Sequence, residues 1–467
     1  MGRLVEHLLS FLNNSHSSSN TQVTPPVVRV TKGTRCGIRT VTLTILNLAL
    51  IWLSLSAGTL WAETITATSC SRNDVGNAVN SAGNGDTVLI PAGNCTWTTN
   101  LTITGKYLTL QGAGAGKTII TDGVSKGAYP NIPQVLDWRT SSDGLSRLTG
   151  ITFQGGTITD GYNKGIIQIV GEASHQFRID HCKFIPTQTA ALYIRGDFWG
   201  VLDHNVFDLS ARHGYGMYII GGKYGDVAWA EGSTLGTERN VFVEDNVFTN
   251  DGSLGFIYPG TDGWGGSRIV FRHNQLKAVT VHNHGTESGG RSRSQRSWEI
   301  YNNTFTADMQ GNSSPSLIAI RGGTGVIYNN TASITNGTIS RFVDYQYYRA
   351  SKSFSPWGQC PSVWDLSSTR CLDQTGVGKG NLLSGDTPSP TGWPDQIADP
   401  AYDWNNRVNG AVSNAISNVP SVVQEGRDFY HQVKPGYTPY TYPHPLTSGS
   451  TTTDSSAPAP PQNLIVK

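Results

Sequence analysis

A short pattern recurs six times in this 467-residue chain and limits the folds that the chain can adopt. Each copy begins with a strand in which apolar and polar residues alternate. A polar pair and then an apolar residue follow this strand. The copies span residues 177–184, 200–207, 241–248, 269–276, 298–305 and 325–331. Their key positions are 23, 41, 28, 29 and 27 residues apart, at Cys182, Asn205, Asn246, Asn274, Asn303 and Asn330. A period near 28 residues predicts the stacked coils of a solenoid.

The recurring asparagine predicts how neighbouring coils are joined. Asn tolerates the left-handed backbone conformation that a tight turn needs, and its amide can bond to the Asn one coil away. We therefore expect the five asparagines to stack in one column, about 4.8 Å apart. Cys182 should cap that column as a small, buried and unreactive side chain. A leucine-rich repeat is excluded because its Leu spacing is absent, and a propeller is disfavoured by the short and variable repeat.

The repeat resembles the coils of the pectate lyase and pectin lyase superfamily. The start of the chain fits the same resemblance, with residues 73–82 as a capping helix and residues 85–93 and 108–114 as early coils. The resemblance covers roughly residues 68–345. It implies an all-β, right-handed parallel β-helix with an N-terminal capping helix, an internal Asn ladder and an irregular C-terminal cover. It implies no single reaction, because one fold can host lyases, hydrolases, esterases and plain binding proteins.

Composition divides the chain into four parts. Residues 1–62 read as a leader with a signal peptide, because Arg35 and Arg39 precede an apolar run over 41–57 and a cleavage site near Ala62. A membrane anchor is the alternative, but the run is short for a span. The other parts are the β-helix at 63–349, an aromatic-rich irregular cover at 350–447, and a Ser/Thr/Pro linker with the start of a truncated module at 448–467.

These features predict a secreted or cell-surface monomer that does not contact a membrane after signal cleavage. The net charge is only +1, so no basic surface for a nucleic acid is expected. In an exported protein, Cys70 and Cys95 should form one disulfide, and Cys360 and Cys371 a second. A metal site on these cysteines is disfavoured, because no CxxC pair or nearby His accompanies them.

A second set of strands predicts where a polysaccharide would bind. These strands cover residues 167–171, 192–196, 217–221, 256–260, 279–283 and 317–322 and should form one parallel sheet. Long loops follow this sheet, and long loops on a repeating scaffold usually carry function. The candidate site residues at this edge are Arg195, Asp197, Lys223, Asp262, His282, His284, Glu287, Arg291, Arg293 and Arg321.

The leading hypothesis is a lyase that cleaves an acidic glycan by β-elimination. Such an enzyme must neutralise the uronate carboxylate, remove the C5 proton and protonate the leaving oxygen. Arg321, or the other arginines of the set, suits the first task, because a guanidinium binds a carboxylate in bidentate fashion. His282, His284 or Lys223 suits the proton transfers.

Two other functions stay open. A glycoside hydrolase needs two carboxylates across the scissile bond, and Asp197, Asp226 and Asp262 are available for that role. The same three residues with Glu172 leave calcium as an option, but no cofactor is certain. The third hypothesis is a protein that binds carbohydrate without cleaving it. It is motivated by the absence of the pectate lyase arginine motif and of the polygalacturonase aspartate series.

The segment 279–284 gives the sharpest prediction. Its alternation places Val279 and Val281 on one side and both histidines on the other. The valines suit the interior, so His282 and His284 should face outward, with Arg321 from the next coil beside them. A neighbouring arginine would keep a histidine neutral and ready to accept a proton. The simpler alternative is that both histidines bond to the loop over 287–296.

Overall fold

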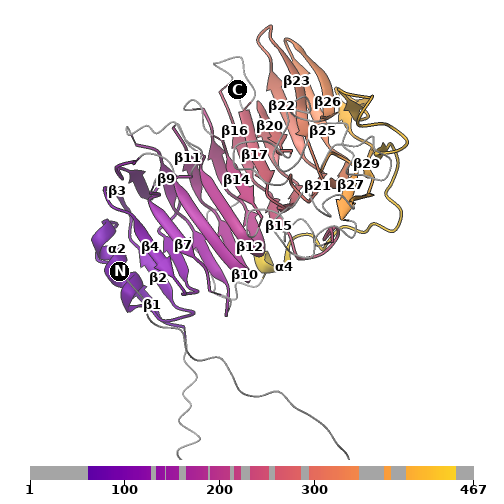
Figure 1. The fold of residues 1–467 in the computed structure, drawn as a ribbon. Coiled ribbons are helices and arrows are strands. Elements are labelled where there is room, and N and C mark those ends of the chain that lie inside the picture. The colour runs from indigo at the N-terminus through magenta and orange to yellow at the C-terminus, as the bar shows by residue number, and fades with distance from the viewer. Residues whose placement is uncertain are drawn as a thin grey trace, which may run out of the picture. The chain divides into compact units, whose positions relative to one another are not determined.

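The computed structural model describes residues 62–448, apart from 128–132, 142, 157–164, 188–189, 211–214, 222–231, 252–257, 286–293, 347–372 and 380–395. These residues fold as a right-handed parallel β-helix whose coils stack along one axis (Figure 1). All but the last residue of the expected leader and all but the first residue of the expected linker lie outside them. No helix in the described ranges is long and apolar enough to cross a membrane.

Each full coil passes through three parallel sheets in the order 1, 2, 3. Sheet 1 contains β4 (Leu101–Thr104), β7 (Leu136–Arg139), β10 (Ile167–Asp180), β12 (Leu192–Asp203), β14 (Met217–Ile220), β17 (Tyr258–Trp264), β20 (Val279–His282), β23 (Ser313–Ile320), β26 (Thr338–Tyr345) and β32 (Ile416–Ser417). Strands β10 and β12 are long enough to continue into sheet 2. Sheet 2 also contains β1 (Thr64–Thr66), β2 (Thr87–Ile90), β5 (Thr109–Gly112), β8 (Ser146–Thr149), β15 (Val241–Glu244), β18 (Arg268–Arg272), β21 (Ser297–Tyr301), β24 (Thr324–Tyr328), β29 (Ala401–Trp404) and β33 (Phe429–Tyr430).

Sheet 3 closes the coil. It contains β3 (Gly93–Trp97), β6 (Thr118–Asp122), β9 (Thr152–Gln154), β11 (Lys183–Ile185), β13 (Val206–Asp208), β16 (Val247–Thr249), β19 (Gln275–Lys277), β22 (Thr304–Asp308), β25 (Thr331–Thr335), β30 (Arg407–Val408) and the antiparallel β31 (Ala411–Val412). A separate antiparallel pair joins β27 (Val377–Lys379) to β28 (Gln396–Ala398). Inside the coils, Phe184, Phe207 and Phe248 stack in register, with ring centres 5.1 and 4.6 Å apart. Stacked apolar side chains thus fill the core coil by coil.

The expected asparagine column is confirmed. In each step, the backbone N–H and the side-chain amide of one Asn donate to the side-chain oxygen of the next, from Asn205 through to Asn330. Cys182 begins the column, because its N–H donates to Asn205 Oδ1 over 3.0 Å. Burial raises the pKa of the Cys182 thiol, which agrees with an unreactive role. Asn406 extends the column by one further coil that the repeat pattern did not reveal.

The column asparagines do not adopt the left-handed backbone conformation that was expected of them. The left-handed residue is the one before each column member, as at His204 (φ 55°) and His273 (φ 56°), whereas none of the column asparagines has a positive φ. Asparagine is therefore required for its hydrogen bonds and not for its backbone freedom. His204 Nδ1 bonds to Asp203 Oδ2 over 2.9 Å, so this Asp-His pair belongs to the coil turn.

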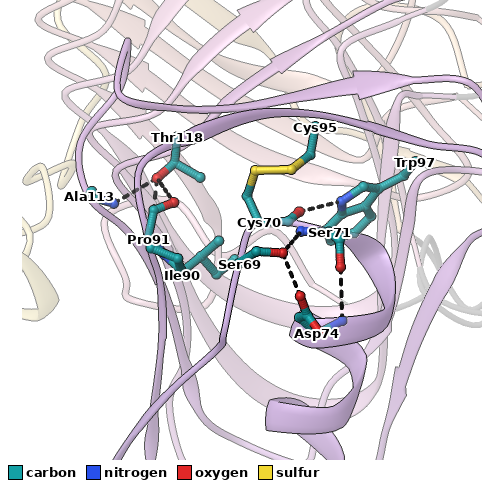
Figure 2. The surroundings of a disulfide bond; sticks show 10 residues. All are labelled: Ser69, Cys70, Ser71, Asp74, Ile90, Pro91, Cys95, Trp97, Ala113 and Thr118. Carbon is teal, nitrogen blue, oxygen red and sulfur yellow. Dashed lines mark hydrogen bonds between the residues drawn. A yellow bond between two sulfur atoms is a disulfide. The ribbon is translucent and has the colours of Figure 1, made fainter.

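The N-terminal cap is the expected short helix, α2 (Arg72–Ser81). Ser71 caps it by accepting a hydrogen bond from Asp74 N. The Cys70–Cys95 disulfide is also present, and it ties the residue before this cap to β3 (Figure 2). Trp97 Nε1 donates to Cys70 O over 2.9 Å in the same group. The second expected disulfide, Cys360–Cys371, lies outside the described residues.

The Cys70–Cys95 link should contribute substantially to stability. A double Cys70→Ala, Cys95→Ala variant releases a loop with a sequence separation of 25 residues. We expect its free energy of unfolding to fall by about 3 kcal/mol, because the unfolded chain regains the entropy of that loop. Urea unfolding without reductant, followed by circular dichroism, measures the change. An unchanged midpoint and slope would contradict the expectation.

The C-terminal region departs from the expected irregular cover. The β-helix continues past residue 349, because β29 pairs with β24 and β30 pairs with β25. The chain then runs back along the outer face of sheet 2, where the last described element is α4 (Pro445–Ser448). Arg272 holds this segment by donating to Tyr440 O and Thr441 O, each over 2.8 Å. This segment therefore covers the outer face of sheet 2 and not that of sheet 1.

Candidate active site

Six of the ten candidate site residues can be placed. Lys223, Glu287, Arg291 and Arg293 lie outside the described ranges, as does Asp226. Of the remaining six, four lie together where sheet 1 ends, and two lie along the same edge. The four that come together are Asp262, His282, His284 and Arg321.

Strand β17 differs from the strand expected at 256–260. It runs on to Trp264, and a bulge between Pro259 and Thr261 takes up Gly260. The Pro-Gly pair indicated a strand end, but a bulge accommodates the extra residue without ending the pairing. Asp262 therefore lies within the strand, beside His282 of β20, and not in a following loop. This shift brings the carboxylate to the histidines.

The outward direction of the two histidines is confirmed. Val279 and Val281 belong to the buried core, whereas His282 and His284 are half-buried on the opposite side. His284 N donates to Gly263 O over 2.8 Å, which fixes the residue against β17. Its backbone oxygen accepts from Gln295 N over 3.3 Å. The link from His284 to residues 294–296 therefore uses the backbone, and the imidazole is directed elsewhere.

Asp262 and His284 form a hydrogen-bonded dyad. His284 Nδ1 lies 2.6 Å from Asp262 Oδ1, and the carboxylate is almost fully buried. Burial acts to raise the pKa of Asp262, but His284, Arg321 and His282 outweigh it, so the pKa is below its usual value. Asp262 is thus held ionised. With Nδ1 directed to this carboxylate, Nε2 is the ring nitrogen through which a neutral His284 would accept a proton.

His282 is held neutral next to this pair. Burial, and next the positive charge of Arg321, lower the pKa of His282 to about 4. The expectation that an arginine keeps a histidine neutral is thus confirmed for His282, although burial is the larger cause. Arg321 itself is positioned by Asn283, whose Oδ1 accepts from Arg321 N over 2.6 Å and whose amide donates to Gly322 O. The sequence gave no sign of this positioning role of Asn283.

The charge state of His282 predicts a pH dependence of stability. The unfolded chain binds a proton near the ordinary pKa of 6.5, whereas the folded protein does so only near about 4. Stability should therefore fall as pH falls through this window, by on the order of 2 kcal/mol from this residue. A His282→Gln variant should lose less stability than the wild type between about pH 7 and pH 4.5. Parallel stability profiles in urea titrations would contradict this assignment.

An aromatic cluster lies next to the dyad, and sequence reasoning did not find it. Trp264 meets His284 edge to face, with ring centres 5.7 Å apart, and contacts Tyr218 at 5.3 Å. Tyr193 and Tyr215 pack against the same group and are half-buried. The rings come from three coils, so only the strand register brings them together. Trp264 and Tyr218 are buried, so only the half-buried rings of Tyr193 and Tyr215 offer ring surface to a sugar.

Arg195 and Asp197 extend this edge toward the N-terminus. Arg195 is in register with Ile220 of β14, and Ile220 is in register with Trp264. It therefore lies on the row that continues to His284, three coils away. Asp197 is exposed and lines a pocket at the corner between sheets 1 and 2. No three His, Cys, Asp or Glu side chains converge as metal ligands within the described ranges.

Comparisons with known proteins concern the fold. No family model and no curated protein matches the chain. Among solved structures, it is similar to an alginate lyase from Paenibacillus sp. str. FPU-7, at 11% identity, with 79% of this chain and 98% of the other covered and a TM-score of 0.38. It is also similar to a PL6 family polysaccharide lyase from Pseudopedobacter saltans, at 12% identity, 82% and 94% coverage and a TM-score of 0.36. Pectin methylesterase PemA from Erwinia chrysanthemi gives 10% identity, 79% and 96% coverage and a TM-score of 0.32. None of these similarities assigns a reaction.

Proposed function

We propose that this protein is an exported polysaccharide lyase that cleaves a uronate-containing glycan by β-elimination. The observation that carries the proposal is the Asp262–His284 dyad at the end of sheet 1, with Arg321 next to it. A buried carboxylate that orients a half-buried histidine is a common way to prepare a general base. An adjacent arginine supplies the charge that a uronate carboxylate needs.

Each step of the reaction has a residue suited to it. Arg321 pairs with the uronate carboxylate and stabilises the negative charge that develops when the C5 proton leaves. His284 Nε2 accepts that proton, and Asp262 stabilises the imidazolium that forms. The electron pair of the C5–H bond then forms the C4–C5 double bond as the C4–O bond breaks. The leaving oxygen takes its proton from the His284 imidazolium.

A product assay tests the proposal. Purified protein is supplied with pectate, alginate and glucuronan, each with and without calcium, and ultraviolet absorbance is followed. Elimination leaves a double bond conjugated with the carboxylate, so a lyase produces absorbance together with new reducing ends. Absorbance from none of these polymers would overturn the lyase assignment. Retention on a polymer without any product would instead identify a binding protein.

The hydrolase alternative is less well supported. It requires one carboxyl group that is protonated at working pH and donates its proton. The pKa of Asp262 is lowered, and its carboxylate already accepts from His284, so it is poorly suited to that role. Reducing ends without ultraviolet absorbance would favour a hydrolase, and single Asp197→Asn, Asp226→Asn and Asp262→Asn variants would then identify its carboxylates.

A further inference from the structure

A second polar pocket opens beside the dyad, at the corner between sheets 1 and 2. It is bounded by β12, by the end of β14 and by the residues that follow Trp264. The chemically distinctive side chains that line it are Asp197, Trp199, Arg239, Ser267 and Arg268. None of these residues belongs to the dyad or is needed for the elimination step.

Two buried polar atoms in the lining of this pocket have no partner among the described residues. Trp199 Nε1 and Ser267 Oγ are buried, and no hydrogen bond to them is found within the part of the chain that the structure describes. Buried donors are normally paired, so an unpaired one indicates a missing water or ligand group. A sugar hydroxyl or carboxylate in the pocket would supply the acceptor that the indole N–H lacks.

The charge in this pocket favours an anionic ligand. Arg268 is fixed, because its guanidinium donates to Gly266 O and Gly232 O over 3.0 and 3.2 Å. Arg239 is exposed and lies over the Trp199 ring, 5.3 Å from its centre. The exposed Arg239 guanidinium is the positive group of the described lining that an anionic ligand would meet. An aromatic ring beside arginines is suited to a sugar ring that carries a carboxylate.

The position of the pocket relates it to the dyad. Trp264 separates the two, because it contacts His284 on one side and is followed on the other by Gly266, Ser267 and Arg268. Neighbouring coils of a parallel β-helix are about 4.8 Å apart, and the pocket lining extends over the three coils of β12, β14 and β17 that precede the coil of His284. A glycan chain running along the helix axis can therefore occupy both.

We propose that this pocket binds a carboxylated sugar unit of the substrate chain, next to the unit that is cleaved. The inference rests on the proposed function, because it takes the same acidic glycan as its ligand. Arg239 is the specificity-determining residue, and Trp199 provides the ring surface and the N–H donor. The pocket thereby makes binding depend on a second carboxylate, away from the bond that breaks.

Binding measurements separate this inference from the lyase assignment. The full-length His284→Ala protein is titrated by calorimetry with hexasaccharides of galacturonate, mannuronate and glucuronate, and with cellohexaose as a neutral probe. Adding Arg239→Gln should weaken binding of the preferred acidic hexasaccharide about tenfold, and Trp199→Phe about threefold or more. Arg407→Gln is the matched control, because Arg407 is exposed and lies on the last coil of sheet 3.

Each outcome supports or overturns the pocket. Weakened binding in Arg239→Gln and Trp199→Phe, but not in Arg407→Gln, supports it, even if the wild type produces no ultraviolet-absorbing product. Elimination by the wild type with an unchanged KM in Arg239→Gln overturns the pocket and leaves the lyase assignment intact. Equal binding of cellohexaose, or no binding of any acidic probe, also overturns it.

Discussion

A His284→Ala variant should lower kcat for uronate elimination by about 100- to 10,000-fold while leaving the fold intact. The imidazole is the group that accepts the C5 proton, and a positioned general base contributes a factor of this size. Asp262→Asn should lower kcat by at least about 100-fold, because an amide can hold the ring in the wrong tautomer. Both losses should appear in kcat more than in KM, since neither residue is assigned to ground-state binding.

A matched pair elsewhere in the chain controls for the loss of an Asp–His interaction. His431 Nδ1 lies 2.8 Å from Asp403 Oδ1 in the last coils, remote in sequence from the dyad. His431→Ala should therefore keep wild-type turnover, with folding of all variants checked by circular dichroism. If His284→Ala keeps more than about half of the wild-type kcat, the base has been assigned wrongly and Lys223 becomes the candidate.

An Asn274→Ala variant should lower the free energy of unfolding by about 3–5 kcal/mol. The Asn274 oxygen accepts from both the N–H and the amide of Asn246. Its own amide donates to Val243 O and to Asn303 Oδ1. Removing the side chain leaves several buried polar groups unpaired, and each such group costs about 1–3 kcal/mol. Urea unfolding measures the change.

Gln275→Ala is the control for this prediction. Gln275 carries a similar amide one residue further along, but it is exposed on β19. Its removal should change the free energy of unfolding by no more than about 0.5 kcal/mol. A loss of that small size in Asn274→Ala as well would show that the column is not a major source of stability.

The sequence alone was sufficient to predict that this protein folds into the stacked coils of a parallel β-helix. The asparagine spacing predicted stacked coils, and the hydrogen-bonded column from Asn205 to Asn330 confirms it. The alternation of Val279 and Val281 with His282 predicted which side chains face outward. Both signals are local, because a single turn or a single strand is enough to produce them. The repeat then makes the turn signal recur in successive coils.

The composition of the site was decided only by the tertiary structure. Asp262 and His284 are 22 residues apart, and their contact depends on the bulge at Gly260, which shifts the register of one strand. The aromatic cluster around Trp264 joins rings from separate coils, whose alignment depends on loops of unequal length between strands. Register between strands distant in sequence is set by packing of the whole coil, so no short stretch of sequence encodes it.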